Sequence, residues 1–173
     1  MDSTKLLKHM AWANQEILGK VAALPDEALG AYSVNPEWTV REIARHIASS
    51  ATWYGWRLLD KSNFTEAETR AWQVKLDLTE VQPATAKDIE ITMGYLKAAD
   101  AELLAASQLP EGDVYREWEG KTIVRKRSTI ISQAIHHATE HRAQLVSALE
   151  TRGFTSINLD DYDLWAFAST ISE

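Results

Sequence analysis

The chain has 173 residues, 45% of them hydrophobic, which is enough for one well-buried core, so we expect residues 1–173 to form a single domain. Its formal net charge of −7 argues against a nucleic-acid-binding protein, because such proteins need a basic face. The sequence contains no cysteine and no apolar stretch of about 18 residues, which excludes disulfides, thiolate metal ligands and a membrane-spanning helix.

Apolar residues recur at helical spacing along the first third of the chain. The first predicted helix covers about residues 3–24, and Pro25 ends it. A second helix is predicted to begin after Trp38. Thr39 and Glu42 have the spacing of a capping box, in which each residue would hydrogen-bond to the backbone of the other.

The middle of the chain is less regular. Residues 60–84 are polar and broken, and only one or two helical turns are predicted there, around Glu66–Trp72. Thr85 with Asp88 repeats the capping pattern and predicts the start of a third long helix. Pro110 ends that helix.

A short β-hairpin is predicted before the last long helix. Residues 114–127 contain two short segments typical of strands, separated by a Glu119–Lys121 turn. Ser128 is predicted to cap the fourth long helix, which Gly153 ends, and residues 160–167 predict a short final helix. The fold class is therefore all-α, a four-helix bundle with a small hairpin, and the cores of such bundles commonly hold metal sites.

Three histidines are candidates for one metal site. His137 and His141 are four residues apart in the last long helix, which places both imidazoles on one face. His46 lies in the second helix, and a third imidazole from a facing helix would leave coordination positions open. Spacing alone leaves open whether His46 is a ligand or a hydrogen-bonded histidine at the rim. Nitrogen ligands do not choose among Zn²⁺, Ni²⁺, Fe²⁺ and Mn²⁺.

The other two histidines are not expected to bind this metal. No second histidine pairs with His9, and His136 lies about 100° around the helix from His137. Four aromatic residues are candidates either for a pocket wall or for the core: Trp53, Tyr54, Trp56 and Trp118.

Polar neighbours of the histidines are candidates for supporting roles. Gln144 follows His141 by three residues and is predicted to support it. Glu42 and Glu140 could each orient an imidazole or act as a base. We favour the capping role for Glu42 and a solvated position for Glu140. Arg142 is expected to pair with an acid across the bundle.

These motifs, in their order, resemble the DinB/YfiT-like superfamily of metal-binding four-helix bundles. The resemblance includes Trp38–Ile47, the segment His137–Leu145 and the closing Asp160–Leu164, and it covers nearly the whole chain. It implies that one histidine of the second helix and two of the fourth bind one divalent metal. These are His46, His137 and His141.

The resemblance implies a metal-dependent enzyme of small-molecule metabolism or detoxification. A thiol S-transferase is favoured ahead of a hydrolase, because similar families activate low-molecular-weight thiols such as bacillithiol, mycothiol or glutathione. The alternatives are a non-catalytic metal- or ligand-binding bundle and histidines that bind no metal in the cell. No catalytic residue is assigned. We expect a cytoplasmic protein with a small-molecule substrate, no membrane partner, and a homodimer as one compatible assembly.

Overall fold

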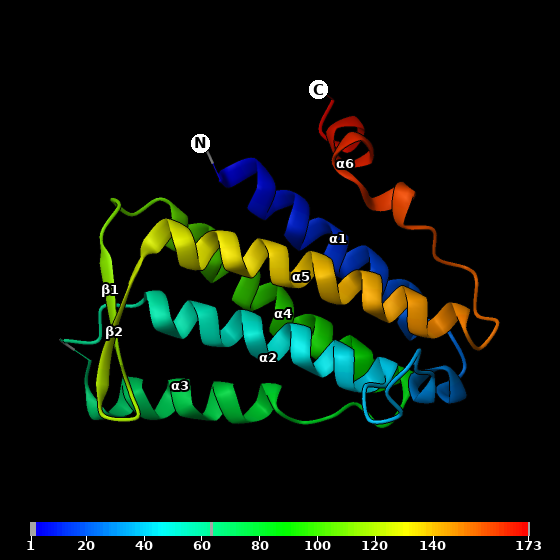
Figure 1. The fold of residues 1–173 in the computed structure, drawn as a ribbon, viewed down its shortest axis with the longest axis horizontal. Coiled ribbons are helices and arrows are strands. Elements are labelled where there is room, and N and C mark those ends of the chain that lie inside the picture. The colour runs from blue at the N-terminus through cyan, green and yellow to red at the C-terminus, as the bar shows by residue number, and fades with distance from the viewer. Residues whose placement is uncertain (1–2, 63, 173) are drawn as a thin grey trace.

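The computed structural model describes residues 3–62 and 64–172, which form a mostly helical molecule with one small sheet (Figure 1). Its α-helices are α1 (Thr4–Ala22), α2 (Val40–Leu58), α3 (Glu66–Thr79), α4 (Ala86–Ser107), α5 (Arg127–Glu150) and α6 (Leu164–Thr170). Two 3₁₀ helices, η1 (Asp26–Gly30) and η2 (Leu159–Tyr162), follow α1 and precede α6. No helix among the described residues is long and apolar enough to cross a membrane.

The four longest helices, α1, α2, α4 and α5, lie side by side and enclose the core (Figure 1). Helix α4 packs against α1 and α2, and α5 packs against α2 and α1. Each contributes fully buried apolar side chains from one face, as amphipathic helices do. Examples are Met10 of α1, Ile43 of α2, Leu96 of α4 and Leu145 of α5.

Helix α3 is longer than the sequence predicted. It runs for 14 residues, twice the length of the predicted Glu66–Trp72 segment. A full capping box starts it: the Thr65 N–H donates to Glu68 Oε2 at 2.8 Å, and the Glu68 N–H donates to Thr65 Oγ1 at 3.2 Å. The helix packs on α2, with the Trp72 ring 5.5 Å from that of Trp56. Exposed residues cover most of its surface, which explains why the segment looks broken in the sequence.

Two predicted helix caps were wrong in detail. Thr39 Oγ1 does accept the Glu42 N–H, but the Glu42 carboxylate turns away to accept from Arg45 and from Gln82, so no reciprocal box forms. Ser128 does not cap α5. Strand β2 runs directly into that helix, which begins at Arg127, and Ser128 already lies in its first turn.

The predicted hairpin is confirmed. Strands β1 (Asp113–Trp118) and β2 (Lys121–Lys126) pair antiparallel, with Trp118 opposite Lys121. The two-residue turn places Glu119 at φ 49° and Gly120 at φ 73°. Positive φ at both positions matches the right-handed twist of the strands, and glycine adopts it without steric cost. The hairpin lies at the end of the molecule where α2 ends and α5 begins (Figure 1).

Candidate metal centre

The side chains of His46, His137 and His141 converge on one point between α2 and α5. The Nε2 atom of His137 lies 3.1 Å from the Nε2 atom of His46 and 3.1 Å from that of His141. His141 is buried, and the other two are partly buried. The structure therefore brings together all three histidines that the sequence singled out, including His46, whose position depends on how α2 and α5 pack.

The nitrogen geometry fits a shared cation. Nitrogen atoms bound to one metal at about 2.0–2.1 Å lie roughly 3.0–3.4 Å apart. The two separations that involve His137, 3.1 Å each, fall in that interval, and all three ligand nitrogens lie within 4.8 Å of one another. Among the described residues, these three histidines are the group of possible ligands that lies close enough to hold one ion, and no carboxylate joins them. Three protein ligands leave a coordination position for water or substrate, which is the pattern of catalytic sites.

The tautomer of His141 follows from its neighbours. The Trp38 indole Nε1–H donates to Gln144 Oε1 at 2.8 Å, and an indole can only donate. The same oxygen lies 2.8 Å from His141 Nδ1. Because this oxygen can only accept, Nδ1 must carry the proton and donate it. In the neutral ring this leaves the lone pair on Nε2, the atom that faces the other histidines. The predicted support of His141 by Gln144 is confirmed.

The surroundings favour neutral imidazoles. The pKa of His137 is lowered to about 4, first by burial and then by the charges that His141 and His46 would carry. Burial also lowers the pKa of His46, with His141 and the Arg45 guanidinium acting in the same direction. At neutral pH these rings therefore retain the lone pairs that a metal needs.

Aromatic rings fix the imidazoles from outside the cluster. The Trp38 ring meets His46 at 5.1 Å and His141 at 5.5 Å between centroids, edge to face in both cases. The Tyr54 ring meets His137 in the same way at 5.6 Å. Tyr54 thus borders the histidine cluster and is more than a core residue.

The two carboxylates suggested as partners do not join the three histidines as ligands. Glu42 forms an ion pair with Arg45, and these contacts, led by the Arg45 hydrogen bond, lower the pKa of Glu42. Arg45 also forms an ion pair with Glu80 of the α3–α4 connection. Glu140 is exposed. The charge of Glu42 acts to raise the pKa of His46, but this carboxylate is hydrogen-bonded to Arg45 and Gln82, and neither Glu42 nor Glu140 belongs to the ligand group.

The remaining histidines stay apart from the centre, as predicted. His136 is exposed on α5. His9 lies 2.8 Å from the carbonyl oxygen of Tyr162, and its ring packs against Trp12 and Phe167, where α1 meets the C-terminal segment. No partner for His9 could be predicted from the sequence, because this contact joins residues 153 positions apart.

A buried polar network lies behind the metal centre. Arg142, 5% exposed, donates to Asn14 Oδ1, and Asn14 Nδ2 donates to Asp100 Oδ2 at 2.9 Å. The acid expected opposite Arg142 is thus present, but Asn14 stands between the two charges. Burial raises the pKa of Asp100 to about 7 and lowers that of Arg142 to about 10. Sequence reasoning missed Asn14 and Asp100, because isolated polar residues in helices α1 and α4 carry no distinguishing pattern.

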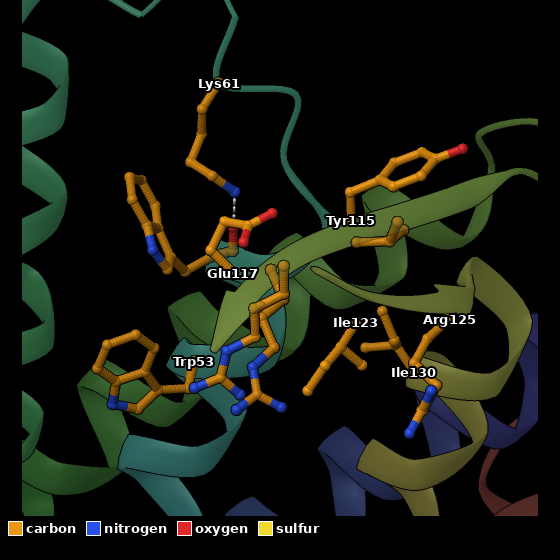
Figure 2. A pocket seen from close by; sticks show the side chains of 11 residues that line it. Trp53, Lys61, Tyr115, Glu117, Ile123, Arg125 and Ile130 are labelled. Carbon is orange, nitrogen blue, oxygen red and sulfur yellow. Dashed lines mark hydrogen bonds between the residues drawn. The ribbon is translucent and has the colours of Figure 1, made fainter. Parts of the chain in front are cut away.

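Part of the predicted aromatic wall lines a pocket near the hairpin. Trp53 and Trp56 border a hollow of about 580 Å³ between α2, the hairpin and the start of α5 (Figure 2). The side chain of Trp118 lies outside the described part of the structure. A smaller hollow of about 330 Å³ shares Trp53 with the first and includes Tyr54, which packs on His137.

The chain belongs to the DinB family, whose family model matches residues 1–170. This match covers all the helices described above, including the histidines of α2 and α5. No curated protein and no solved structure shows a significant match to the chain.

Proposed function

We propose that this DinB family member binds one divalent transition metal through His46, His137 and His141 and acts as a metal-dependent, thiol S-transferase-like enzyme of small-molecule metabolism or detoxification. The proposal treats the four long helices as a DinB/YfiT-like four-helix bundle and residues 1–173 as one domain. The observation that carries it is that His137 Nε2 lies 3.1 Å from the Nε2 atoms of both His46 and His141, without a carboxylate among the three ligands in the described residues.

The open ligand set favours catalysis over a purely structural role. Structural metal sites are closed by a fourth protein ligand, whereas catalytic sites keep a position for an exchangeable group. Three histidines from two helices supply a neutral ligand set, so the bound cation would keep its full positive charge. That charge would favour an anionic fourth ligand.

The pairing of Glu42 with Arg45 favours a thiol over water as the group that is activated, because it leaves this carboxylate less available as a base. Metalloenzymes that activate water commonly place a carboxylate next to it as a general base. Here Glu42 is held by Arg45 and Gln82, and Glu140 is exposed. A thiol needs no such base, because a coordinated thiol is deprotonated outright.

The chain's own residues would hold the ligands in the correct state. Gln144 and Trp38 fix the His141 tautomer with Nε2 free to bind. Tyr54 restricts the His137 ring, and burial keeps that ring neutral at physiological pH. Such outer partners typically change metal affinity by about 10- to 100-fold.

The test combines metal analysis with a substrate panel. Protein purified without a histidine tag should contain about one equivalent of metal by elemental analysis. Metal-loaded and chelated protein would then be compared across bacillithiol, mycothiol and glutathione, each with a set of electrophiles. Turnover by the metal-loaded protein alone supports the proposal, and turnover that survives chelation contradicts it.

Two other outcomes would select the alternatives. Hydrolysis of esters or amides by the metal-loaded protein, without any thiol, would indicate a hydrolase. A stoichiometric metal that exchanges no ligand and supports no turnover would indicate a binding protein. Water exchange can be followed by paramagnetic relaxation after substitution with Mn²⁺.

A further inference from the structure

The pocket between α2 and the hairpin is cationic, although the protein as a whole carries a net charge of −7. Its volume of about 580 Å³ is in the usual range for small-molecule sites, roughly 300–1,000 Å³. Four basic side chains and one acidic side chain, Glu117, contribute to its lining. The basic residues are Arg57, Lys61, Arg116 and Arg125.

Arg57 is the central cation of this pocket. Its side chain is half-buried, and its Nε atom is buried without a hydrogen-bond partner. Burial, followed by the positive charge of Arg116, lowers the pKa of Arg57. The described residues give it only the face of the Tyr54 ring, 5.7 Å from the guanidinium carbon, and no carboxylate partner. A half-buried guanidinium next to a second one is costly until an anion neutralises it.

The one carboxylate in the lining does not take this role. Glu117 Oε1 accepts the hydroxyl of Thr122 on the neighbouring strand at 2.6 Å. Figure 2 shows Glu117 on the hairpin, and Trp53 of α2 and Ile130 of α5 also line the pocket. Lys61 is held over the Trp56 ring at 4.7 Å, where its ammonium donates to the Trp56 carbonyl oxygen at 2.9 Å. Arg57 and Lys61 are therefore positioned by neutral partners, aromatic rings and carbonyl groups.

A second hollow adjoins this pocket on the side of the histidine cluster, where its lining residue Tyr54 packs on His137. It shares Trp53, Arg57 and Arg116 with the first pocket and adds Ser50 and Tyr54. Tyr54 contacts His137, and Ser50 follows His46 by four residues on the same face of α2. The interval from His46 to Arg57 is 11 residues, a rise of about 16 Å along the helix. An extended small molecule could therefore have one end at each place.

We propose that the pocket binds the carboxylate end of a small organic acid with an apolar or aromatic body, through Arg57 and Arg116. The planar guanidinium fork matches a carboxylate, and Trp53 and Trp56 supply the apolar wall. The identification of this acid as the substrate or thiol of the metal centre rests on the proposed function. Binding of the acid itself does not.

The test uses three probes of one shape: 4-phenylbutyrate, its neutral amide 4-phenylbutyramide and the cation 4-phenylbutylamine. Calorimetric titration of the wild-type protein should show the acid binding about 10-fold or more tightly than the amide, and the amine binding most weakly. Equal affinity for acid and amide would overturn the proposal. So would preference for the amine.

Variants locate the site. Arg57→Gln should remove the preference for the acid, whereas the matched control Arg70→Gln on the exposed face of α3 should retain it. Retention of the preference in Arg57→Gln would overturn the assignment. The comparison of acid and amide on the wild-type protein tests the charge preference without any variant. The proposal can therefore still be contradicted if the Arg57→Gln protein folds poorly. Lys61→Met offers a second change in the same pocket.

The same titration on chelated protein and on His137→Ala separates this inference from the proposed function. The acid preference should persist in both, because the pocket lining contains no metal ligand. Persistence together with an absence of thiol turnover would support the pocket while contradicting the proposed enzyme. Metal-dependent thiol turnover without any acid preference would support the proposed enzyme and contradict the pocket as an acid-binding site. Loss of the preference on chelation would overturn the pocket as a site formed by these residues.

Discussion

The Trp38 indole donates to Gln144 Oε1 at 2.8 Å across 106 residues of sequence, and this bond determines which nitrogen of His141 carries the proton. An indole N–H cannot accept, so it determines the orientation of the amide, and the amide oxygen in turn determines the imidazole tautomer. Trp38, before α2, and Gln144, after the second histidine of α5, thus act together to determine the tautomer of His141. Their spacing along the sequence does not show that they meet.

Gln144→Leu should weaken metal binding by about 10- to 100-fold, because His141 loses the acceptor that holds its Nδ1 proton. Competition titration with a chelator dye would measure the change. Trp38→Phe keeps an aromatic ring and removes only the donor, so we expect a smaller effect. Glu140→Gln, on the exposed side of the same helix, is the matched control and should leave affinity unchanged. A Gln144→Leu protein with wild-type affinity would refute this role.

Alanine at any one of His46, His137 and His141 should weaken metal binding by more than the roughly 100-fold that loss of an outer partner costs. Elemental analysis after dialysis against a weak chelator would show less than one equivalent. His136→Ala and His9→Ala should keep full occupancy, since both side chains lie away from the three Nε2 atoms. Equal losses from His136→Ala and His137→Ala would mean that the wrong face of α5 has been assigned.

Gly120→Ala should destabilise the fold by about 1 kcal/mol, because an alanine Cβ is disfavoured at positive φ. Glu119→Asn should stabilise it by a few tenths to about 1 kcal/mol, because asparagine tolerates that conformation and Asn-Gly is the preferred pair for such turns. Urea denaturation would measure both. Gly112→Ala is the control, since the added Cβ there meets no atom within 4 Å and φ is not in the positive range. A cost at Gly112 equal to that at Gly120 would contradict the argument.

Local patterns predicted the helices that bury an apolar face, and long-range contacts account for what they missed. The spacing of His137 and His141 places them together within a single helix. Predicting that His46 joins them requires knowing how α2 packs on α5. Residue spacing does not determine this packing, and only the family resemblance indicated His46 as the third ligand. Helix α3 was underestimated because it is mostly exposed, although the Thr65-x-x-Glu68 box was readable in the sequence.

The cationic pocket was beyond prediction for a related reason. Arg57 and Arg116 are 59 positions apart and meet only because the hairpin folds back beside the end of α2. In the sequence each is an ordinary surface arginine. The Asn14–Asp100 contact is similar, because it joins α1 to α4 inside the core. Neither contact follows from the composition or periodicity of one segment.

Asp100 should make the protein less stable as the pH rises. Its folded pKa of about 7 lies above the ordinary value of 3.8, owing first to burial, while Asn14 and Arg142 oppose the shift. Between these two values the folded state binds more protons than the unfolded state, so the free energy of unfolding falls with increasing pH. The contribution of Asp100 should fall by about 2–3 kcal/mol between about pH 5 and pH 8.

Asp100→Asn removes this titration and keeps the shape of the side chain, so it isolates the contribution of Asp100. Three other titratable groups lie near Asp100: Arg142 is its charged neighbour, and Tyr54 and His137 line the same small cavity. All three are present in both the wild-type protein and the variant. Urea denaturation of wild type and variant at pH 5 and pH 8 gives a double difference in which their titrations largely cancel. The stability of wild type relative to Asp100→Asn should be greater at pH 5 than at pH 8. An unchanged or reversed difference would show that Asp100 is ionised in the folded state well below pH 7. Asn14 and Arg142 would then stabilise its carboxylate more than burial destabilises it.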